Sequence, residues 1–205
     1  MPARFVRPAV GDNTRQRILK AAMLRFSSQS YESTGLRDIA SDVGVDMAYV
    51  HRSFGSKENL FRAAVEATLM PDSWLVAEPA DLHRSLVADL LADKGADEIR
   101  PFDIVVRSFS SPDASRVLHE IMEENFVGPF VSKCPQVSKE RASMIVAVLA
   151  GVGIFRDVVN APALQGGERD TELGDLLANV IALLMNEGAE GQAVSANTPI
   201  EPEPL

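Results

Sequence analysis

The side chains best suited to specific chemistry lie in the stretch 34–57, where cationic, hydroxyl and aromatic groups alternate with apolar ones. Arginine and lysine pair with phosphates, and a hydroxyl beside the free N–H groups of a helix start can hold a phosphate as well. Small apolar side chains can contact the methyl group of thymine. This combination is typical of a DNA-binding surface. The residues predicted to contact DNA are Thr34, Arg37, Met47, Ala48, Tyr49, His51, Arg52 and Lys57.

Two short helices joined by a tight turn are predicted to position these side chains. Thr34 is expected to cap the first helix, because its hydroxyl can accept a free backbone N–H. Gly44 lets the chain turn after this helix, since glycine reaches positive φ without strain. Asp46 is expected to cap the second helix and Gly55 to end it. The inward-facing residues of the two helices are predicted to be Leu36, Ile39, Ala40, Val43, Val50 and Phe54.

The spacing of Ala40, Gly44 and Val50 is typical of a helix–turn–helix motif. Ala40 is small enough for the second helix to cross closely, Gly44 makes the turn, and Val50 fills the gap between the helices. In this motif the second helix lies in the major groove and contacts base edges. Similar turns occur in ordinary helical bundles, so the motif by itself leaves a purely structural role open.

Three sequence segments in a fixed order extend the motif on both sides. They are T-R-Q-R-I-L-K-A-A at 14–22, T-G-L-R-D-I-A-S-D-V-G-V at 34–45 and Y-V-H-R-S-F-G-S-K-E-N-L-F at 49–61. In these segments the chain resembles the TetR family of transcriptional regulators, and the resemblance ends at about residue 65. The remainder is similar to the family only in length and helical character.

The resemblance implies that Met47, Ala48 and Tyr49 lie nearest the base edges. His51 stands where the family usually has a phosphate-binding tyrosine, and Ser53 stands where a second aromatic residue or a histidine is common. These departures leave the individual contacts open. The resemblance also implies that the helix after the motif moves when a ligand binds, which changes the spacing of the two recognition helices in a dimer.

The predicted fold is all-α, with about nine helices: an N-terminal three-helix helix–turn–helix head and a helical C-terminal ligand-binding and dimerisation domain. The predicted divisions are a flexible arm over 1–12, the DNA-binding head over 13–57, the C-terminal domain over 58–187 and a disordered tail over 188–205. Ser111-Pro112 is a strong helix start, and that helix is expected to stop near Gly128-Pro129. Other helices are expected over 82–91, 102–109, 138–159 and 171–186.

Charge is divided unevenly along the chain, whose formal net charge is −9. Residues 1–62 contain ten basic and six acidic side chains, a balance of +4, so the remaining residues have a balance of −13. A cationic head on an acidic body predicts contact with phosphates at one end only. Arg4 and Arg7 in the arm could add to this contact, although a solvated arm that does not touch DNA is the plainer interpretation.

The helix expected over 138–159 is apolar on almost all sides between Met144 and Phe155. Such a helix must be covered on more than one side, and the small residues in this run allow another helix to approach closely. Together with the helix over 171–187, it is predicted to form a four-helix interface in a two-fold symmetric homodimer. The two heads would then contact a palindromic operator in double-stranded DNA. A central core helix in a monomer is the alternative.

An unidentified small-molecule effector is expected to bind among the helices of the C-terminal domain. His119 and Glu123 are four residues apart and could share a helix face, but a solvated acidic face is a plainer interpretation than a metal pair. No metal or cofactor is predicted. The candidate lining residues, which core packing could equally explain, are Trp74, Phe102, Phe109, His119, Met122, Glu123, Phe126 and Phe155.

Several function classes find no support in the sequence. The motifs of serine hydrolases, phosphate-loop proteins, dinucleotide-binding enzymes and zinc proteases are absent, so no enzymatic activity is predicted. A single cysteine, Cys134, excludes an intramolecular disulfide and fits a reducing compartment. The longest apolar run is too short to cross a bilayer, and the N-terminus lacks the apolar core of a secretory signal. We therefore expect a cytoplasmic protein.

These patterns together predict a ligand-responsive DNA-binding transcriptional regulator. The most favoured form is a repressor that binds its operator as a dimer and is released by a small molecule. One alternative is a helical small-molecule-binding or dimerisation protein without DNA-binding activity. Another is a helical enzyme whose site is hidden in the C-terminal domain.

Overall fold

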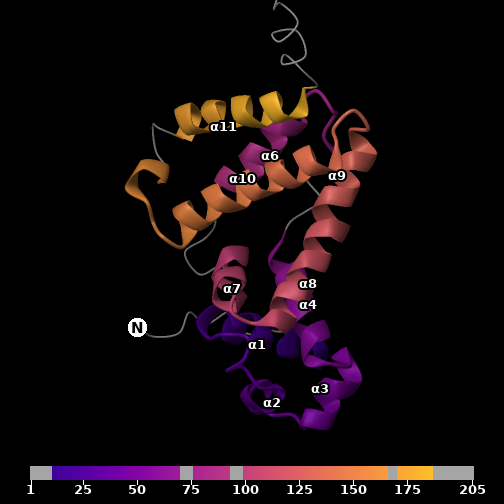
Figure 1. Ribbon diagram of the computed structural model, residues 1–205. Coiled ribbons are helices and arrows are strands. Elements are labelled where there is room, and N and C mark those ends of the chain that lie inside the picture. The colour runs from indigo at the N-terminus through magenta and orange to yellow at the C-terminus, as the bar shows by residue number, and fades with distance from the viewer. Residues whose placement is uncertain (1–10, 70–75, 93–98, 166–169, 187–205) are drawn as a thin grey trace, which may run out of the picture.

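The computed structural model describes residues 11–69, 76–92, 99–165 and 170–186. Within these ranges the chain forms helices and connecting turns but no strand, which confirms the all-α prediction. Figure 1 shows α1 to α3 at one end of the molecule and α6, α10 and α11 at the other, with α7 and α8 between them. None of the described helices is long and apolar enough to cross a membrane.

Helix α1 (Thr14–Ser28) supports the two short helices α2 (Leu36–Val43) and α3 (Met47–Phe54). Gly44 ends α2 in the left-handed conformation, at φ 73° and ψ 38°, as its predicted role at the turn requires. The side chain of Asp46 caps α3 by accepting a hydrogen bond of 2.8 Å from the backbone N–H of Ala48. Val50 and Phe54 are buried, so the predicted inward face of α3 is confirmed.

The prediction that Thr34 caps α2 is wrong. The cap residue is Gly35, whose backbone N–H donates to the carboxylate of Asp38 at 3.2 Å. Thr34 is completely buried, and its hydroxyl donates to the backbone carbonyl of Ser30 at 3.0 Å. This hydroxyl therefore closes the turn before α2 and has no exposed surface with which to hold a phosphate.

Helix α4 (Lys57–Thr68) carries the core of the head into the rest of the molecule. Its buried Phe61 meets the ring of Phe26 at a centroid distance of 5.0 Å and the ring of Tyr31 at 5.1 Å, both edge to face. The same apolar cluster includes residues of α7 (Pro101–Ser108) and α8 (Pro112–Met122). Movement of α7 or α8 would therefore change the packing of α1 and α4 directly.

A second apolar cluster lies farther from the head. It joins α6 (Leu82–Leu91), α9 (Gly128–Lys133), α10 (Lys139–Asp157) and α11 (Asp170–Met185). The sequence placed α6 correctly and placed both ends of α10 and α11 within two residues. A 3₁₀ turn over Pro162–Leu164 follows α10.

The predicted start at Ser111-Pro112 is confirmed, because the Ser111 hydroxyl accepts the backbone N–H of Ala114 at 3.3 Å. The predicted stop near Gly128-Pro129 is wrong. A π-helical turn over Glu123–Val127 connects α8 directly to α9. In this wider turn the N–H of Gly128 donates to the carbonyl of Glu123, so the chain continues past Pro129, which has no N–H to donate.

Candidate nucleic-acid interface

The exposed face of α3 presents the residues predicted to contact base edges. Met47 and Tyr49 are 39% and 38% exposed, large fractions for such apolar side chains, and Ala48 beside them is also exposed. Val50 and Phe54, on the opposite face, fasten the helix to the head. An exposed apolar and aromatic face on a helix of this length fits the major groove and can contact thymine methyl groups.

Arg52 is held close to this face by Tyr49. The guanidinium carbon of Arg52 lies 5.6 Å from the centroid of the Tyr49 ring, within the range of a cation–π contact. His51 is exposed on the same helix. The α3 surface therefore presents a partly oriented cation next to apolar groups.

Several cations of the head are already engaged in holding it together. Arg25 forms a two-point ion pair with Asp42 at 2.6 and 2.8 Å, and this hydrogen bonding raises the pKa of Arg25. Arg17 donates to the backbone carbonyl of Val43 at 2.8 Å, and Lys20 pairs with Asp12 at 2.7 Å. These contacts connect α1 to the end of α2 and to the residues before α1. The three cations therefore stabilise the head, whether or not they also contact phosphate.

Arg37 stands apart from this group. It is exposed near the start of α2, about two helical turns before Gly44, and among the described residues it forms no ion pair or side-chain hydrogen bond. Lys57 is half-buried at the start of α4, with its ammonium 4.1 Å from the centroid of the Tyr31 ring. Arg37 is therefore the cation outside α3 that is most open to a partner, whereas the ammonium of Lys57 already lies against an aromatic ring.

The residues predicted to line an effector site do not form one group. Phe102, Met122 and Phe126 are half-buried, and Phe126 packs against both apolar clusters. Glu123 is half-buried too, but its carboxylate pairs with Lys139 at 2.7 Å.

Three of the other predicted lining residues lie on the surface of the described chain. Phe109 and Phe155 are each 56% exposed, and His119 is exposed on α8. Within one protomer these three side chains lie on outer faces, at the end of α7, on α8 and on α10, and so they do not form one site with Phe102, Met122 and Phe126. Trp74 lies outside the described residues.

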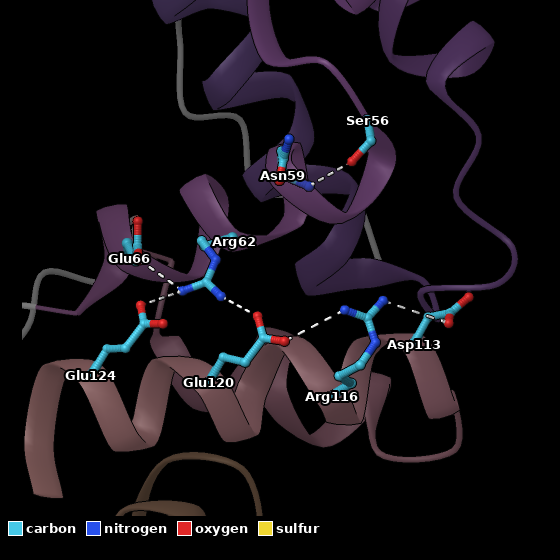
Figure 2. A network of polar contacts seen from close by, with 8 residues as sticks. All are labelled: Ser56, Asn59, Arg62, Glu66, Asp113, Arg116, Glu120 and Glu124. Carbon is cyan, nitrogen blue, oxygen red and sulfur yellow. Dashed lines mark hydrogen bonds and ion pairs between the residues drawn. The ribbon is translucent and has the colours of Figure 1, made fainter. Parts of the chain in front are cut away.

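A cluster of ion pairs that the sequence did not reveal connects α4 to α8 (Figure 2). Arg62 on α4 pairs with Glu120 and, at 3.0 Å, with Glu124 of the π-helical turn. It also reaches Glu66 on its own helix at 3.7 Å, and Glu120 meets Arg116 at 3.5 Å. The only signal in the sequence was the spacing of Glu120 and Glu124, which places both carboxylates on one side of a helix.

Further polar contacts join the head to the C-terminal domain. Arg107 of α7 donates to the backbone carbonyl of Ser27 at the end of α1, at 2.7 Å. The Ser111 hydroxyl that caps α8 donates to the carboxylate of Glu32 at 2.5 Å. Together with the Arg62 cluster, these contacts connect α1 and α4 with α7 and α8 at several separated points.

A glycine turn, a short helix with an exposed apolar and cationic face, and a larger helical body behind them define a helix–turn–helix DNA-binding protein. Comparison with protein families agrees. Residues 18–64 match the bacterial regulatory proteins of the tetR family, and residues 80–184 match the tetracyclin repressor-like C-terminal domain. The chain belongs to the TetR family, and it is a ligand-responsive DNA-binding regulator of the repressor type.

Solved structures with the same fold include several regulators. A TetR-family regulator from Streptomyces coelicolor is 24% identical, with 88% of this chain and 98% of its own covered and a TM-score of 0.55. NalD from Pseudomonas aeruginosa is 20% identical, with 83% and 95% covered and a TM-score of 0.60. The multidrug-binding protein EbrR is 20% identical, with 84% and 99% covered and a TM-score of 0.53. No curated protein matches the sequence.

Proposed function

We propose that this regulator binds a palindromic operator as a homodimer, with one α3 in each half-site. The exposed face of α3 carries the proposal, because Met47, Ala48 and Tyr49 are open to solvent while the opposite face is buried. Arg52 and His51 extend this face. Arg37 meets a base edge or a phosphate, and Lys57 meets a phosphate beside it.

The proposed dimer forms through α10 and α11. Outward-facing apolar residues recur on both helices, opposite the stripes that face the second apolar cluster. The exposed ones are Met144 and Phe155 on α10 and Leu176, Val180 and Leu183 on α11, and exposed Val159 follows α10. A two-fold axis through these helices would cover the apolar residues with a second copy of themselves. This arrangement also gives exposed Phe155 a place in an interface rather than in an interior.

The proposed divisions remain an arm over 1–12, a head over 13–57, a C-terminal domain over 58–187 and a tail over 188–205. Residues 1–10, including Arg4 and Arg7, and the whole tail lie outside the described residues. The shared core of α1, α4, α7 and α8 supports a head that responds as a unit to the helices behind it.

The proposed effector is a small molecule that binds between the two apolar clusters, where Phe102, Met122 and Phe126 are half-buried. NalD is a repressor of a multidrug efflux pump, and EbrR was solved with proflavin. These two relatives support a site for a small molecule in a domain of this shape. Binding there would shift α7 and α8, and the Arg62 cluster would carry the shift to α4.

A mobility-shift titration of the full chain tests the proposal. The probe is the DNA upstream of the chain's own coding sequence, with a scrambled duplex of equal length as control. We expect a complex that is selective for the upstream DNA and weaker at 200 mM than at 50 mM salt, because phosphate contacts release counterions. Equal affinity for both duplexes would contradict operator recognition.

A further inference from the structure

Two arginines at the junction of α7 and α10 have buried N–H groups without hydrogen-bond partners. They are Arg100, which precedes α7, and Arg156, near the end of α10. Only one other buried side-chain polar atom among the described residues lacks a partner, the hydroxyl of Tyr31 in the head. Buried donors of charged groups are nearly always satisfied, so their concentration at one junction calls for a cause.

Arg156 is the more unusual of the two. It is only 7% exposed, and no carboxylate of the described residues lies within ion-pairing distance of its guanidinium. Its neighbour Asp157 is already engaged, because this carboxylate accepts from Arg100 at 3.0 Å. A buried positive charge without a partner is strongly unfavourable, since desolvation of the guanidinium is not offset. Among the residues that the structure describes, Arg156 therefore has no anion beside it.

An aromatic ring packs against α10 one turn before this charge. Gly153 lies one turn before Arg156 on the same buried face of α10. A Cβ atom at Gly153 would lie only 2.1 Å from the ring of Phe102, so this ring packs directly against the α10 backbone. The junction thus combines one unpaired guanidinium with an aromatic ring that is itself only half-buried.

We infer that this junction binds an organic carboxylate, with the carboxylate on Arg156 and the apolar part of the molecule against Phe102. One unpaired guanidinium matches a single negative charge and can form two parallel hydrogen bonds with a carboxylate. The more highly charged phosphate would require further cations. The inference specifies the class of the proposed effector, and so its regulatory part rests on the proposed function.

The first test measures stability without any ligand. Arg156→Met in the full chain should leave the Tm unchanged or raise it, because it removes an unpaired buried charge while keeping the apolar volume. Arg141→Met is the matched control on the same helix, since Arg141 donates to the backbone carbonyls of Leu184 and Asn186 at 3.3 and 2.5 Å. This control should lower the Tm. A comparable loss for Arg156→Met would show a structural ion pair, for example with the second copy, and would overturn the inference.

The second test adds four carboxylates, each paired with its neutral amide: benzoate, phenylacetate, hexanoate and decanoate. At tenfold excess over its Kd, a bound carboxylate should raise the Tm of the parent and of Arg141→Met by roughly 3–6 °C. Arg156→Met should show no rise, and the amides should act on none of the proteins. A parent that responds to none of the four carboxylates, or an Arg156→Met variant that responds as the parent does, would refute the site.

Mobility shift then separates this inference from the proposed function. The active carboxylate should release the upstream DNA from the parent but not from Arg156→Met, which should bind that DNA as tightly as the parent when no carboxylate is present. Binding of the carboxylate without release would overturn its role as effector. Failure of the parent itself to bind DNA selectively would overturn the proposed function and leave the Tm result standing.

Discussion

The residues of the head divide into those that hold it together and those left to meet a partner. Arg17, Lys20 and Arg25 have backbone or carboxylate partners within the head. Arg37 has none among the described residues, and Arg52 lies only against a ring that is itself exposed. The positive balance of the head is therefore a poor measure of its DNA-binding charge, which is concentrated in a few side chains near α3.

We expect Arg37→Ala to weaken binding to the upstream DNA about tenfold, because one charged hydrogen-bonding contact is lost. The fold should be unchanged, since Arg37 is exposed and its side chain has no ion pair or hydrogen bond among the described residues. Titration by mobility shift at several salt concentrations measures both the affinity and its salt dependence.

Arg84→Ala is the control for Arg37→Ala, because Arg84 is equally exposed but lies on α6 in the C-terminal domain. It should leave the affinity as it is in the parent. If Arg37→Ala also left the affinity unchanged, Arg37 would not contact the DNA.

The buried Tyr31 should make the stability of the head depend on pH. Burial, and to a lesser degree the nearby Glu58, raises the pKa of Tyr31 to about 12 from its ordinary 10.0. Above pH 10 the unfolded chain releases this proton while the folded chain retains it, so stability is present below about pH 10 and is lost as the pH approaches about 12. Tyr31→Phe should abolish this loss.

At pH 8 the same variant should be at least as stable as the parent, because the Tyr31 hydroxyl is buried without a hydrogen-bond partner. Urea unfolding at pH 8, 10 and 11 measures the difference. Tyr49→Phe, with an exposed ring, is the control and should follow the parent at every pH. Equal pH profiles for the parent and Tyr31→Phe would contradict the assignment.

At the scale of residues, the sequence predicted most of the exposed residues of the DNA-binding surface, but it did not predict the ion pairs and hydrogen bonds that hold the head together. Met47, Tyr49 and Arg37 followed from helical spacing, because exposure on a short amphipathic helix repeats with its period. The prediction for Thr34 failed because its hydroxyl donates to the carbonyl of Ser30 in the preceding turn, and Gly35 takes the cap position instead. The pair Arg25–Asp42 joins residues of different helices, and no local pattern encodes such a contact.

At the scale of elements, the boundaries that depend on caps were predictable and those that depend on packing were not. Ser111, Asp46 and Gly44 act locally, so each marks a helix end in the sequence. Pro129 is different. A proline would normally end an α-helix, because its ring clashes with the preceding turn and it has no N–H to donate, but the wider π-helical turn before it lets the helix continue. The shared core of α4, α7 and α8 also lay beyond local patterns, since it depends on how these helices cross.

Arg62 should stabilise the crossing of α4 and α8 more than its exposure suggests. Its removal leaves Glu66 and Glu124 without the cation they share, while Glu120 keeps only its contact with Arg116 at 3.5 Å (Figure 2). We expect Arg62→Met to lower the free energy of unfolding by about 1 kcal/mol and to speed amide exchange in α4. Urea unfolding and hydrogen exchange measure the two effects.

Arg116→Met is the matched control for Arg62→Met. Arg116 also pairs with Glu120, but all its ion pairs lie within α8. It should therefore change stability less and leave exchange in α4 as in the parent. Equal effects of the two variants would show that the link between the helices contributes nothing of its own.

At the scale of the whole molecule, the sequence suggested where the second copy binds, and the distribution of exposed apolar residues agrees with that suggestion. The outward faces of α10 and α11 carry half of the exposed large apolar side chains of the described residues, with Leu183 70% exposed. If these faces meet around a two-fold axis, each head is held at a fixed distance from the other. Affinity for a palindrome then depends on dimerisation, although no residue of the interface touches DNA.

The double variant Leu176→Glu and Val180→Glu should separate the protomers, because it places like charges opposite one another in a desolvated interface. Sedimentation should give the mass of one chain where the parent gives that of two, and affinity for the upstream DNA should fall by more than tenfold because the half-sites are then bound singly. Val76→Glu adds the same kind of charge at a residue 82% exposed and outside α10 and α11, so it should change neither quantity. A double variant that still sediments as a dimer would place the interface elsewhere, and a monomer that keeps full affinity would mean that one head suffices for recognition.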